Sequence, residues 1–222
     1  MSIQIAFQFP ASRYHATPFG RHANEGSIEW PPSPWRLLRA LTSVGYSSQF
    51  WDDLGTDSVG RELIEALAST LPIYCLPKLV GSHSRHFMPI LEKKNPKTSL
   101  ELKNTLILDT FGRISPDEEL RVKWDVDLRT DAECLIDKLC KNMNYLGRSE
   151  SWVISRRVVE LEDSTDEFRC FPVQGSRKPI KNGEQEQVAV LVATPPIEYL
   201  KWRKKSLRDQ CVETQWIRIR KI

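Results

Sequence analysis

The stretch Tyr145-Leu-Gly-Arg-Ser-Glu-Ser-Trp152 lies where a charged helical pattern ends and an aromatic, β-branched run begins. Gly147 favours the positive-φ conformation that ends a helix. Arg148, Ser149 and Ser151 add a cation and hydroxyl groups beside the backbone N–H groups that such a turn leaves exposed. Tight glycine turns with donors and a positive charge are typical of phosphate-binding sites. The stretch therefore predicts a helix-to-strand junction that faces an anionic ligand.

The sequence on both sides of this junction predicts regular elements. A helix is expected from its N-cap Thr130 to Tyr145, and a strand over Trp152–Leu161. Ser33-Pro34 is typical of a helix start, with Pro at the first helical position. Strict alternation of apolar and polar residues predicts strands. The remaining core strands are expected at 3–9, 72–79, 106–111 and 120–126, and the remaining helices at 34–44 and 60–69.

The expected order of core elements is strand, helix, strand, strand, helix, strand, which is the βαββαβ pattern of ferredoxin-like α+β domains. RNA-recognition modules share this pattern and hold single strands on the sheet and its loops. Residues 80–104 are expected to form a long, basic β-hairpin. Residues 165–222 are expected to form a β/α extension, with a hairpin tip at 178–185, a strand at 188–192, a basic helix at 196–208 and a strand or tail at 216–222. One elaborated domain over 1–222 accounts for the pattern.

Composition is that of a soluble globular protein, with 40% hydrophobic and 27% charged residues and a net charge of +3. Charge is unevenly distributed along the chain. Eight basic and two acidic residues fall between positions 199 and 222, whereas nine acidic residues fall between 109 and 137. A chain of this kind is suited to bind a polyanion on one face and a partner on another.

Several classes of protein receive no support from the sequence. No run of 18 apolar residues is present, and the N-terminus has no signal-peptide pattern, so a cytoplasmic protein without a membrane partner is expected. Five cysteines without CxxC spacing predict reduced thiols. The GxGxxG, P-loop, GxSxG and HExxH motifs are missing, which disfavours nucleotide hydrolases, serine hydrolases and metalloenzymes. No cofactor and no metal are expected.

The histidines are the first candidates for catalysis. A metal-independent ribonuclease needs a base for the 2′-OH, an acid for the leaving oxygen and a cation for the phosphorane. Tyr14, His15 and His86 are the candidate groups for such chemistry. Alternatively, these histidines bond to the backbone in polar loops or contact RNA without catalysis. His83 and His86 are three apart, but no third ligand with suitable spacing accompanies them.

Basic side chains at three further places are candidates for phosphate contacts. Segment 80–104 joins seven basic residues to Phe87 and Met88, a mixture suited to phosphates and bases, although a solvated hairpin has the same composition. Arg36 and Arg39 share a helix face and point either to a phosphate or to solvent. The basic run LKWRKKSLR near the C-terminus is either an RNA-binding patch or a solvated helix face.

Three motifs, in this order, carry a family resemblance: Trp30-Pro-Pro-Ser-Pro-Trp-Arg-Leu-Leu-Arg-Ala-Leu41, Ser82-His-Ser-Arg-His-Phe-Met-Pro89 and Tyr145-Leu-Gly-Arg-Ser-Glu-Ser-Trp152. Together they resemble the N-terminal, Cas-five-like half of the CRISPR-associated Cas-five/Cas-six fusion proteins of type I-U (I-G) systems. The resemblance covers most of residues 1–220. The fused family continues into a Cas-six half, whereas this chain stops at Ile222. It is thus expected to be either a stand-alone Cas-five protein or part of a fusion.

The resemblance implies a RAMP protein with a ferredoxin-like core and a protruding thumb hairpin near 80–104. Such subunits cap the 5′ handle of a CRISPR RNA in a Cascade ribonucleoprotein complex for antiviral defence. They contact a Cas-seven-type backbone subunit and the large subunit, and meet target DNA indirectly. The glycine loop after the second core helix holds RNA in this family, which corresponds to Gly147, Arg148 and Ser149 here. His83, Arg85 and His86 match the family's His-x-Arg-His motif.

Eleven residues are accordingly predicted to bind RNA: Arg13, Arg36, Arg39, His83, Arg85, His86, Lys97, Gly147, Arg148, Ser149 and Arg156. Because Arg156 and Arg157 alternate along a strand, only one of them shares the face of the loop. The leading hypothesis is a non-catalytic RNA-binding subunit. The alternative is a metal-independent endoribonuclease that processes precursor CRISPR RNA. A third possibility is an interaction module that uses the acidic segment 109–137.

Overall fold

The computed structural model of the chain describes residues 2–22, 25–52, 57–93, 100–159, 168–172, 185–193 and 214–220. Lys97 and the helix expected at 196–208 lie outside these residues, as does the hairpin tip expected at 178–185 except for its last position. Among the described residues, no helix is long and apolar enough to cross a membrane.

The core has the βαββαβ order that the sequence predicts. Its strands are β1 (Ile3–Gln8), β3 (Ile73–Leu76), β6 (Glu119–Trp124) and β7 (Ile154–Val158), and its helices are α1 (Pro34–Ser47), α2 (Ser58–Ser69) and α3 (Thr130–Asn142). The strands lie in the order β7-β1-β6-β3, and all neighbours are antiparallel. Two helices connect β1 to β3, and one connects β6 to β7. This arrangement is the ferredoxin-like fold, so the predicted fold class is confirmed.

The sheet extends beyond β3 through part of the C-terminal region. The added strands are β8 (Phe168–Pro172), β10 (Thr214–Arg220) and β9 (Gln185–Leu191), in that order along the sheet. Strands were expected at 188–192 and, as strand or tail, at 216–222; β9 includes 188–191 and β10 includes 216–220, while 221–222 lie outside the described residues. The extension therefore enlarges the core sheet.

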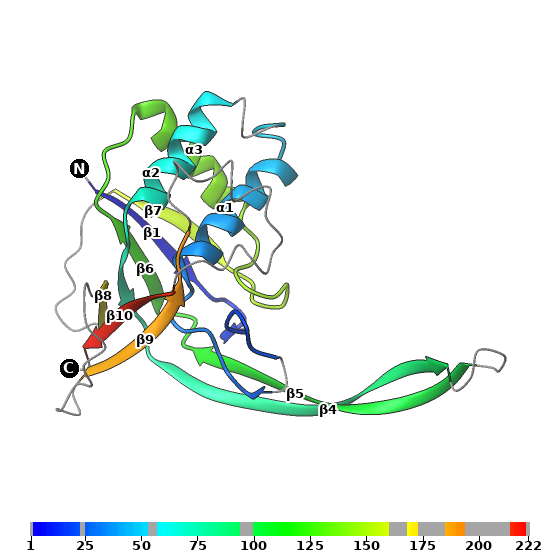
Figure 1. Cartoon of the computed structure of the whole chain (residues 1–222). Coiled ribbons are helices and arrows are strands. Elements are labelled where there is room, and N and C mark those ends of the chain that lie inside the picture. Colours follow the sequence, from blue (N-terminus) through cyan, green and yellow to red (C-terminus); the bar gives the residue numbers. More distant parts are fainter. Residues whose placement is uncertain are drawn as a thin grey trace.

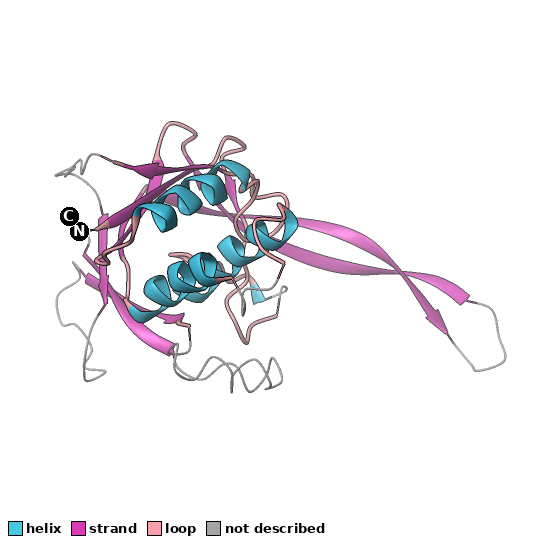
Figure 2. Cartoon of the chain, turned by 90° about the horizontal axis from the view of Figure 1, so that it is seen from above, coloured by secondary structure: helices cyan, strands magenta, loops and turns pink. Residues whose placement is uncertain are grey.

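The hydrophobic core lies between this sheet and the three helices (Figure 1). In β6, Leu120, Val122 and Trp124 are buried, and each pairs in register with a buried apolar residue of β1. Figure 2 shows the three helices lying over one face of the sheet. The alternating pattern thus directs one set of side chains toward the helices and leaves the other set on the opposite face.

The start of α1 is built as the sequence predicts. Ser33 is the N-cap, and its Oγ accepts a hydrogen bond from the backbone N–H of Arg36 at 3.3 Å. Pro34 occupies the first turn, where its missing N–H costs nothing. The hydroxyl of Tyr74 in β3 donates to the carbonyl of Pro32 at 2.9 Å, so the start of α1 is tied to the sheet.

The ends of α3 differ from the expectation. Arg129 is the N-cap and makes no capping side-chain bond, while Thr130 is the first helical residue. The helix ends at Asn142, before Gly147, so Gly147 is not a helix C-cap. Instead, residues 144–153 fold back on themselves, and Tyr145 and Trp152 form an antiparallel bridge. The glycine serves this turn because the chain must reverse before entering β7.

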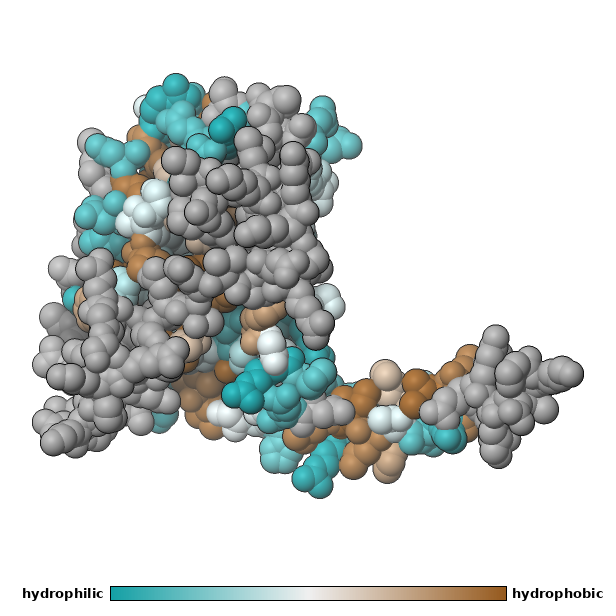
Figure 3. Space-filling view, in the orientation of Figure 1, coloured by the Kyte–Doolittle hydropathy of each residue, from teal (hydrophilic) through white to brown (hydrophobic). Residues whose placement is uncertain are grey.

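The basic hairpin is longer than the predicted 80–104. β4 (Leu79–Lys93) and β5 (Leu100–Ile114) pair along their whole length, so the predicted strand 106–111 belongs to the hairpin. At its base, β2 (Arg13–Tyr14) pairs with β5 to form a second sheet. The hairpin projects far from the body of the molecule (Figures 1 and 2). Figure 3 shows hydrophobic side chains along it. Phe87 and Leu91 of β4 are both exposed.

Candidate nucleic-acid interface

The segment 144–153, here termed the Gly147 loop, is a compact turn closed by its own backbone. The N–H of Val153 donates to the carbonyl of Asn144 at 3.0 Å, and the N–H of Leu146 to that of Ser151 at 3.0 Å. The N–H of Ser151 donates to the carbonyl of Arg148 at 2.9 Å. Gly147 has a φ of 98°, which side-chain-bearing residues rarely adopt. The loop is therefore a rigid support for Arg148 and Ser149.

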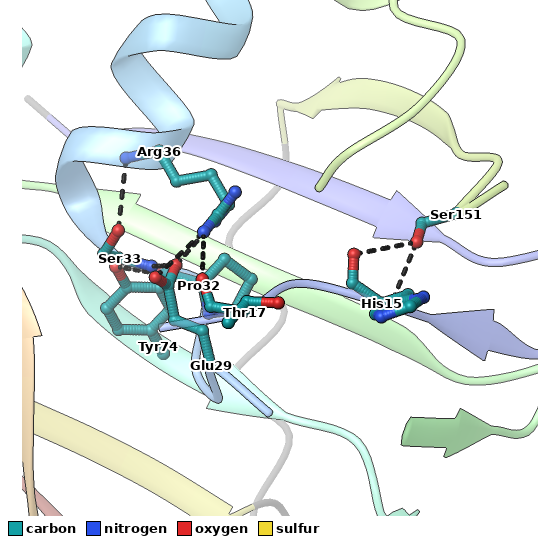
Figure 4. Close-up of polar contacts among 8 residues, drawn as sticks. All are labelled: His15, Thr17, Glu29, Pro32, Ser33, Arg36, Tyr74 and Ser151. Atoms are coloured by element: carbon teal, nitrogen blue, oxygen red, sulfur yellow. Dashed lines mark hydrogen bonds and ion pairs between the residues drawn. The ribbon is translucent and has the colours of Figure 1, made fainter. Parts of the chain in front are cut away.

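His15 anchors this loop through its backbone. The N–H of Arg148 donates to the carbonyl of His15 at 2.8 Å. The Oγ of Ser151 accepts from the N–H of His15 at 2.7 Å and donates to its carbonyl at 3.3 Å (Figure 4). A Cβ on Gly147 would lie 2.5 Å from the same carbonyl oxygen. The Ser151 hydroxyl and the Arg148 N–H, expected to face a ligand, are thus used inside the protein.

The imidazole of His15 is buried and held by Glu150. Its Nδ1 lies 2.7 Å from Oε1 of Glu150, and the side chain is only 3% exposed. Burial lowers the pKa of His15, and the nearby charge of Arg148 lowers it further, although Glu150 acts in the opposite direction. The ring is therefore held neutral near pH 7 and shielded from a polynucleotide.

Tyr14, the neighbour of His15, is also fully buried. Burial raises the pKa of its hydroxyl well above the ordinary value, and the charge of Glu29 raises it further. The hydroxyl oxygen has no hydrogen-bond partner among the described residues. A general base needs a lowered pKa and access to the substrate, and Tyr14 has neither. Two of the three candidate catalytic groups therefore lie out of reach of an RNA phosphate.

The third candidate, His86, lies on the hairpin close to the Gly147 loop. Asp109 of β5 joins the two elements: Nη1 of Arg148 lies 3.3 Å from its Oδ1, and Nδ1 of His86 lies 3.5 Å from its Oδ2. The side chains of Arg148 and His86 are 38% and 49% exposed, whereas that of Asp109 is 17% exposed. Sequence reasoning missed Asp109, because only the strand register places it between the side chains of Arg148 and His86.

Arg13 contributes a further cation at the base of the hairpin. Its guanidinium lies over the ring of Phe111, 4.2 Å from the ring centroid. Phe111 and Asp109 are two positions apart on β5, so both point to the same face of the hairpin. The predicted residues Arg13, His86 and Arg148 are thus brought together on one side.

His83 and Arg85 lie on the opposite face of the hairpin. They alternate with His86 along β4, so the His-x-Arg-His motif is divided between two faces. There they line a hollow of about 310 Å³ together with Leu108, Thr110 and Gly26. The structure therefore does not bring the whole motif to the Gly147 loop.

Arg36 is committed to an internal ion pair. Its Nε lies 2.7 Å from Oε1 of the buried Glu29, its Nη2 lies 3.1 Å from Oε2, and the same Nη2 donates to the carbonyl of Thr17 at 2.9 Å (Figure 4). The Glu29 carboxylate also accepts from the N–H of Ser33 at 2.9 Å. Arg36 therefore fixes the loop before α1. Arg39 is exposed and lies over Trp35, 4.7 Å from the ring centroid.

Arg156 and Arg157 point to opposite faces of β7, as their alternation predicts. Arg157 contacts α3, with its Nε 2.9 Å from Asp137 and its Nη1 3.2 Å from Glu133. Arg156 lies on the other face, where its Nη2 is 3.0 Å from Oε2 of Glu119 in β6. Of these two arginines, only Arg156 can therefore contact a ligand on the face of β7 away from α3.

Four of the nine acidic residues of the segment 109–137 take part in these ion pairs. Asp109, Glu119, Glu133 and Asp137 each hold a basic side chain. Within the described part of the chain, no group of three or more His, Cys, Asp or Glu side chains is arranged to hold a metal ion. The described cysteines, Cys75, Cys134, Cys140 and Cys170, are free thiols.

Comparison with known proteins gives likenesses among solved structures, but no family. No family model matches the chain, and no curated protein matches it. A solved structure described as the crystal structure of a CRISPR protein from Archaeoglobus fulgidus is similar to it, with 16% sequence identity and a TM-score of 0.46. The match covers 100% of this chain and 86% of that one. At this level of similarity, it establishes neither a family nor an activity.

Proposed function

We propose that this protein is a non-catalytic RNA-binding subunit that holds the backbone of a single-stranded RNA where the Gly147 loop meets the hairpin. One observation carries the proposal: Arg148 from the loop and His86 from the hairpin converge on the single carboxylate of Asp109. Two partly exposed cationic or polar donors from separate elements thus face one point at the surface.

The guanidinium of Arg148 retains capacity for a phosphate. Arg carries five N–H donors in a planar fork that matches phosphate oxygens. The contact with Asp109 is made by Nη1, and the side chain is 38% exposed. Ser149 next to it is exposed as well. Because Gly147 and His15 fix the backbone of the loop, the guanidinium is presented with little loss of conformational entropy on binding.

The identity of the RNA follows from the three sequence motifs. They resemble Cas-five-type RAMP proteins, so we propose that the ligand is the 5′ handle of a CRISPR RNA in a Cascade complex. In that assembly the chain would contact a Cas-seven-type backbone subunit and the large subunit. The ferredoxin-like core with a projecting hairpin supports this assignment, because the resemblance implies both features.

The alternative, a metal-independent endoribonuclease, has less support from the site. Acid–base cleavage needs at least two groups at the scissile phosphate. Tyr14 and His15 are buried, which leaves His86 as the exposed member of the candidate set. Incubation with repeat RNA in EDTA separates the two functions. RNA cleavage that disappears in His86→Ala would refute the non-catalytic assignment.

The binding function is tested by titrating handle RNA into wild type and Arg148→Ala over a series of salt concentrations. We expect weaker binding for the variant. We also expect the slope of log affinity against log salt to fall by about 0.7 for each lost phosphate contact. Arg61→Ala is the matched control, because Arg61 is an exposed arginine paired with Glu65 on α2. Equal affinity and equal slope for Arg148→Ala and wild type would contradict the proposal.

A further inference from the structure

Two large aromatic side chains flank the Gly147 loop and are exposed to solvent. Tyr145 is 48% exposed and Trp152 is 61% exposed. Their neighbours Leu146 and Val153 are buried, so the loop directs apolar residues both inward and outward. Leaving two aromatic rings in water forfeits the free energy of burial, about 1.5–3 kcal/mol for a large apolar side chain. The pair therefore has the character of a contact surface.

The backbone places these two side chains next to each other. Tyr145 and Trp152 face each other across an antiparallel bridge. The hydrogen bonds on either side of it, from Val153 to Asn144 and from Leu146 to Ser151, show that this is a non-hydrogen-bonded pair. In such pairs the Cα atoms approach to about 4.5 Å, and both side chains rise on the same side. The two side chains thus rise side by side on one face of the bridge, here termed the aromatic surface.

Beyond this aromatic surface, exposed side chains follow along β7 as far as Arg156. Ile154 is 59% exposed, and Arg156 follows it on the same face of the strand. The intervening Ser155 is turned toward α3, where its Oγ donates to the carbonyl of Cys140 at 2.9 Å. Trp152, Ile154 and Arg156 therefore form a strip on the face away from α3.

Two partly exposed guanidinium groups lie beside this strip, those of Arg148 and Arg156, which are 38% and 55% exposed. Arg148 lies within the loop, and Arg156 lies at the far end of the strip. Three carboxylates adjoin them: Asp109 pairs with Arg148, Glu119 pairs with Arg156, and Glu150 hydrogen-bonds to the buried His15. Aromatic rings interleaved with arginines are the surface that single-stranded nucleic acids use, because every base has a face that stacks.

We propose that Tyr145 and Trp152 form a stacking platform for an unpaired nucleobase of single-stranded RNA. This inference rests on the proposed function, since Arg148 holds the backbone of the same strand. The stacked base belongs to a nucleotide beside the phosphate at Arg148. Stacking is tolerant of sequence, so the platform fixes the position of the strand rather than reading the identity of the base.

The test compares the affinities of wild type and variants for two probes at fixed salt. One probe is a short single-stranded oligouridylate, and the other is an abasic oligonucleotide of the same length. Trp152→Ala should weaken oligouridylate binding by about 5- to 150-fold, the range for loss of one stacked base. Trp152→Phe should keep most of the affinity, whereas Trp152→Leu should lose it. All variants should bind the abasic probe equally, because its phosphates are unchanged.

Two controls keep the result specific. Tyr145→Ala should reproduce the effect of Trp152→Ala from the other side of the bridge. Val159→Ala removes an exposed apolar side chain just beyond β7, 79% exposed, and should bind as wild type does. The unfolding transition of each variant shows that it is folded, as expected for side chains on the surface.

Several outcomes would overturn the inference. If Trp152→Ala binds oligouridylate as wild type does while Arg148→Ala does not, the platform is refuted and the RNA-binding function stands. If Trp152→Leu and Trp152→Phe bind oligouridylate with equal affinity, stacking is not involved, and the surface is an apolar protein contact instead. If wild type shows no salt-dependent affinity for RNA, the proposed function fails, and the platform fails with it.

Discussion

Replacing Gly147 by Ala tests whether the Gly147 loop is the rigid support described above. The backbone there has a φ of 98°, and the new Cβ would lie 2.5 Å from the carbonyl oxygen of His15. A residue forced into such a conformation costs about 1–3 kcal/mol. Relief of the clash would also strain or break the bond from the Arg148 N–H to His15, which contributes about 0.5–1.5 kcal/mol. We therefore expect a loss of about 2–4 kcal/mol in the free energy of unfolding.

Gly20→Ala is the matched control for this experiment. Gly20 also has a positive φ, 77°, but nothing lies within 4 Å of the position that its Cβ would take. It therefore isolates the conformational cost, about 1–2 kcal/mol. The difference between the two variants measures the close approach of the loop to His15.

Urea unfolding followed by tryptophan fluorescence measures both variants. A loss of 2–4 kcal/mol corresponds to a fall in Tm of roughly 4–16 °C for a chain of this size. If Gly147→Ala costs no more than Gly20→Ala, within about 0.5 kcal/mol, the contact between the loop and His15 does not constrain the loop. The same result would remove the reason for presenting Arg148 as a preorganised donor.

Three further predictions concern stability and reactivity. Glu29→Ala leaves the guanidinium of Arg36 without its carboxylate, so the free energy of unfolding in urea should fall by about 3–5 kcal/mol. A fall of less than about 1 kcal/mol would show that the pair does not stabilise the fold. The pKa of His15 is lowered in the folded state, so the unfolded chain takes up the proton first and stability falls as pH drops below about 6.5. His15→Asn should remove part of this slope between roughly pH 7 and 5 in thermal unfolding, and an unchanged slope would contradict the assignment. Burial raises the pKa of the Cys140 thiol to about 12, whereas Cys134 is exposed. Mass spectrometry after iodoacetamide treatment of the folded protein should therefore find Cys134 alkylated and Cys140 unmodified. Equal modification of the two thiols would contradict the burial of Cys140.

Some of the predicted RNA-binding residues could be placed from the sequence, and others only from the tertiary structure. Placing His83 and Arg85 on the face opposite His86 requires only the period of two along a strand, so the sequence contained this result. The internal role of Arg36 depends on Glu29, which reaches it from the loop before α1. No periodic pattern links those two positions. A lone arginine on a helix has the same local signature whether it pairs internally or binds phosphate.

The interpretation of Gly147 shows the same limit. A glycine after a charged helical run is typical of a C-cap, and this predicted a helix that ends there. The helix in fact stops at Asn142, because residues 144–153 close on themselves and dock on His15. The positive φ of Gly147 was expected correctly. The group that leaves no room for a Cβ at this position is the carbonyl of His15, which lies far away in the sequence, near the N-terminus.

By itself, the sequence determined the βαββαβ core and the existence of a long hairpin, because alternation, helical periodicity and the Ser33-Pro34 helix start are local signals. Only the tertiary structure decided which charged and polar groups face solvent. The bonds between His15 and Ser151 join residues 136 positions apart, and the pair of Asp109 and Arg148 joins residues 39 positions apart. Such contacts arise when strands and loops pack together, and packing is what withdraws Tyr14, His15 and Arg36 from the surface while leaving Arg148, Tyr145 and Trp152 upon it.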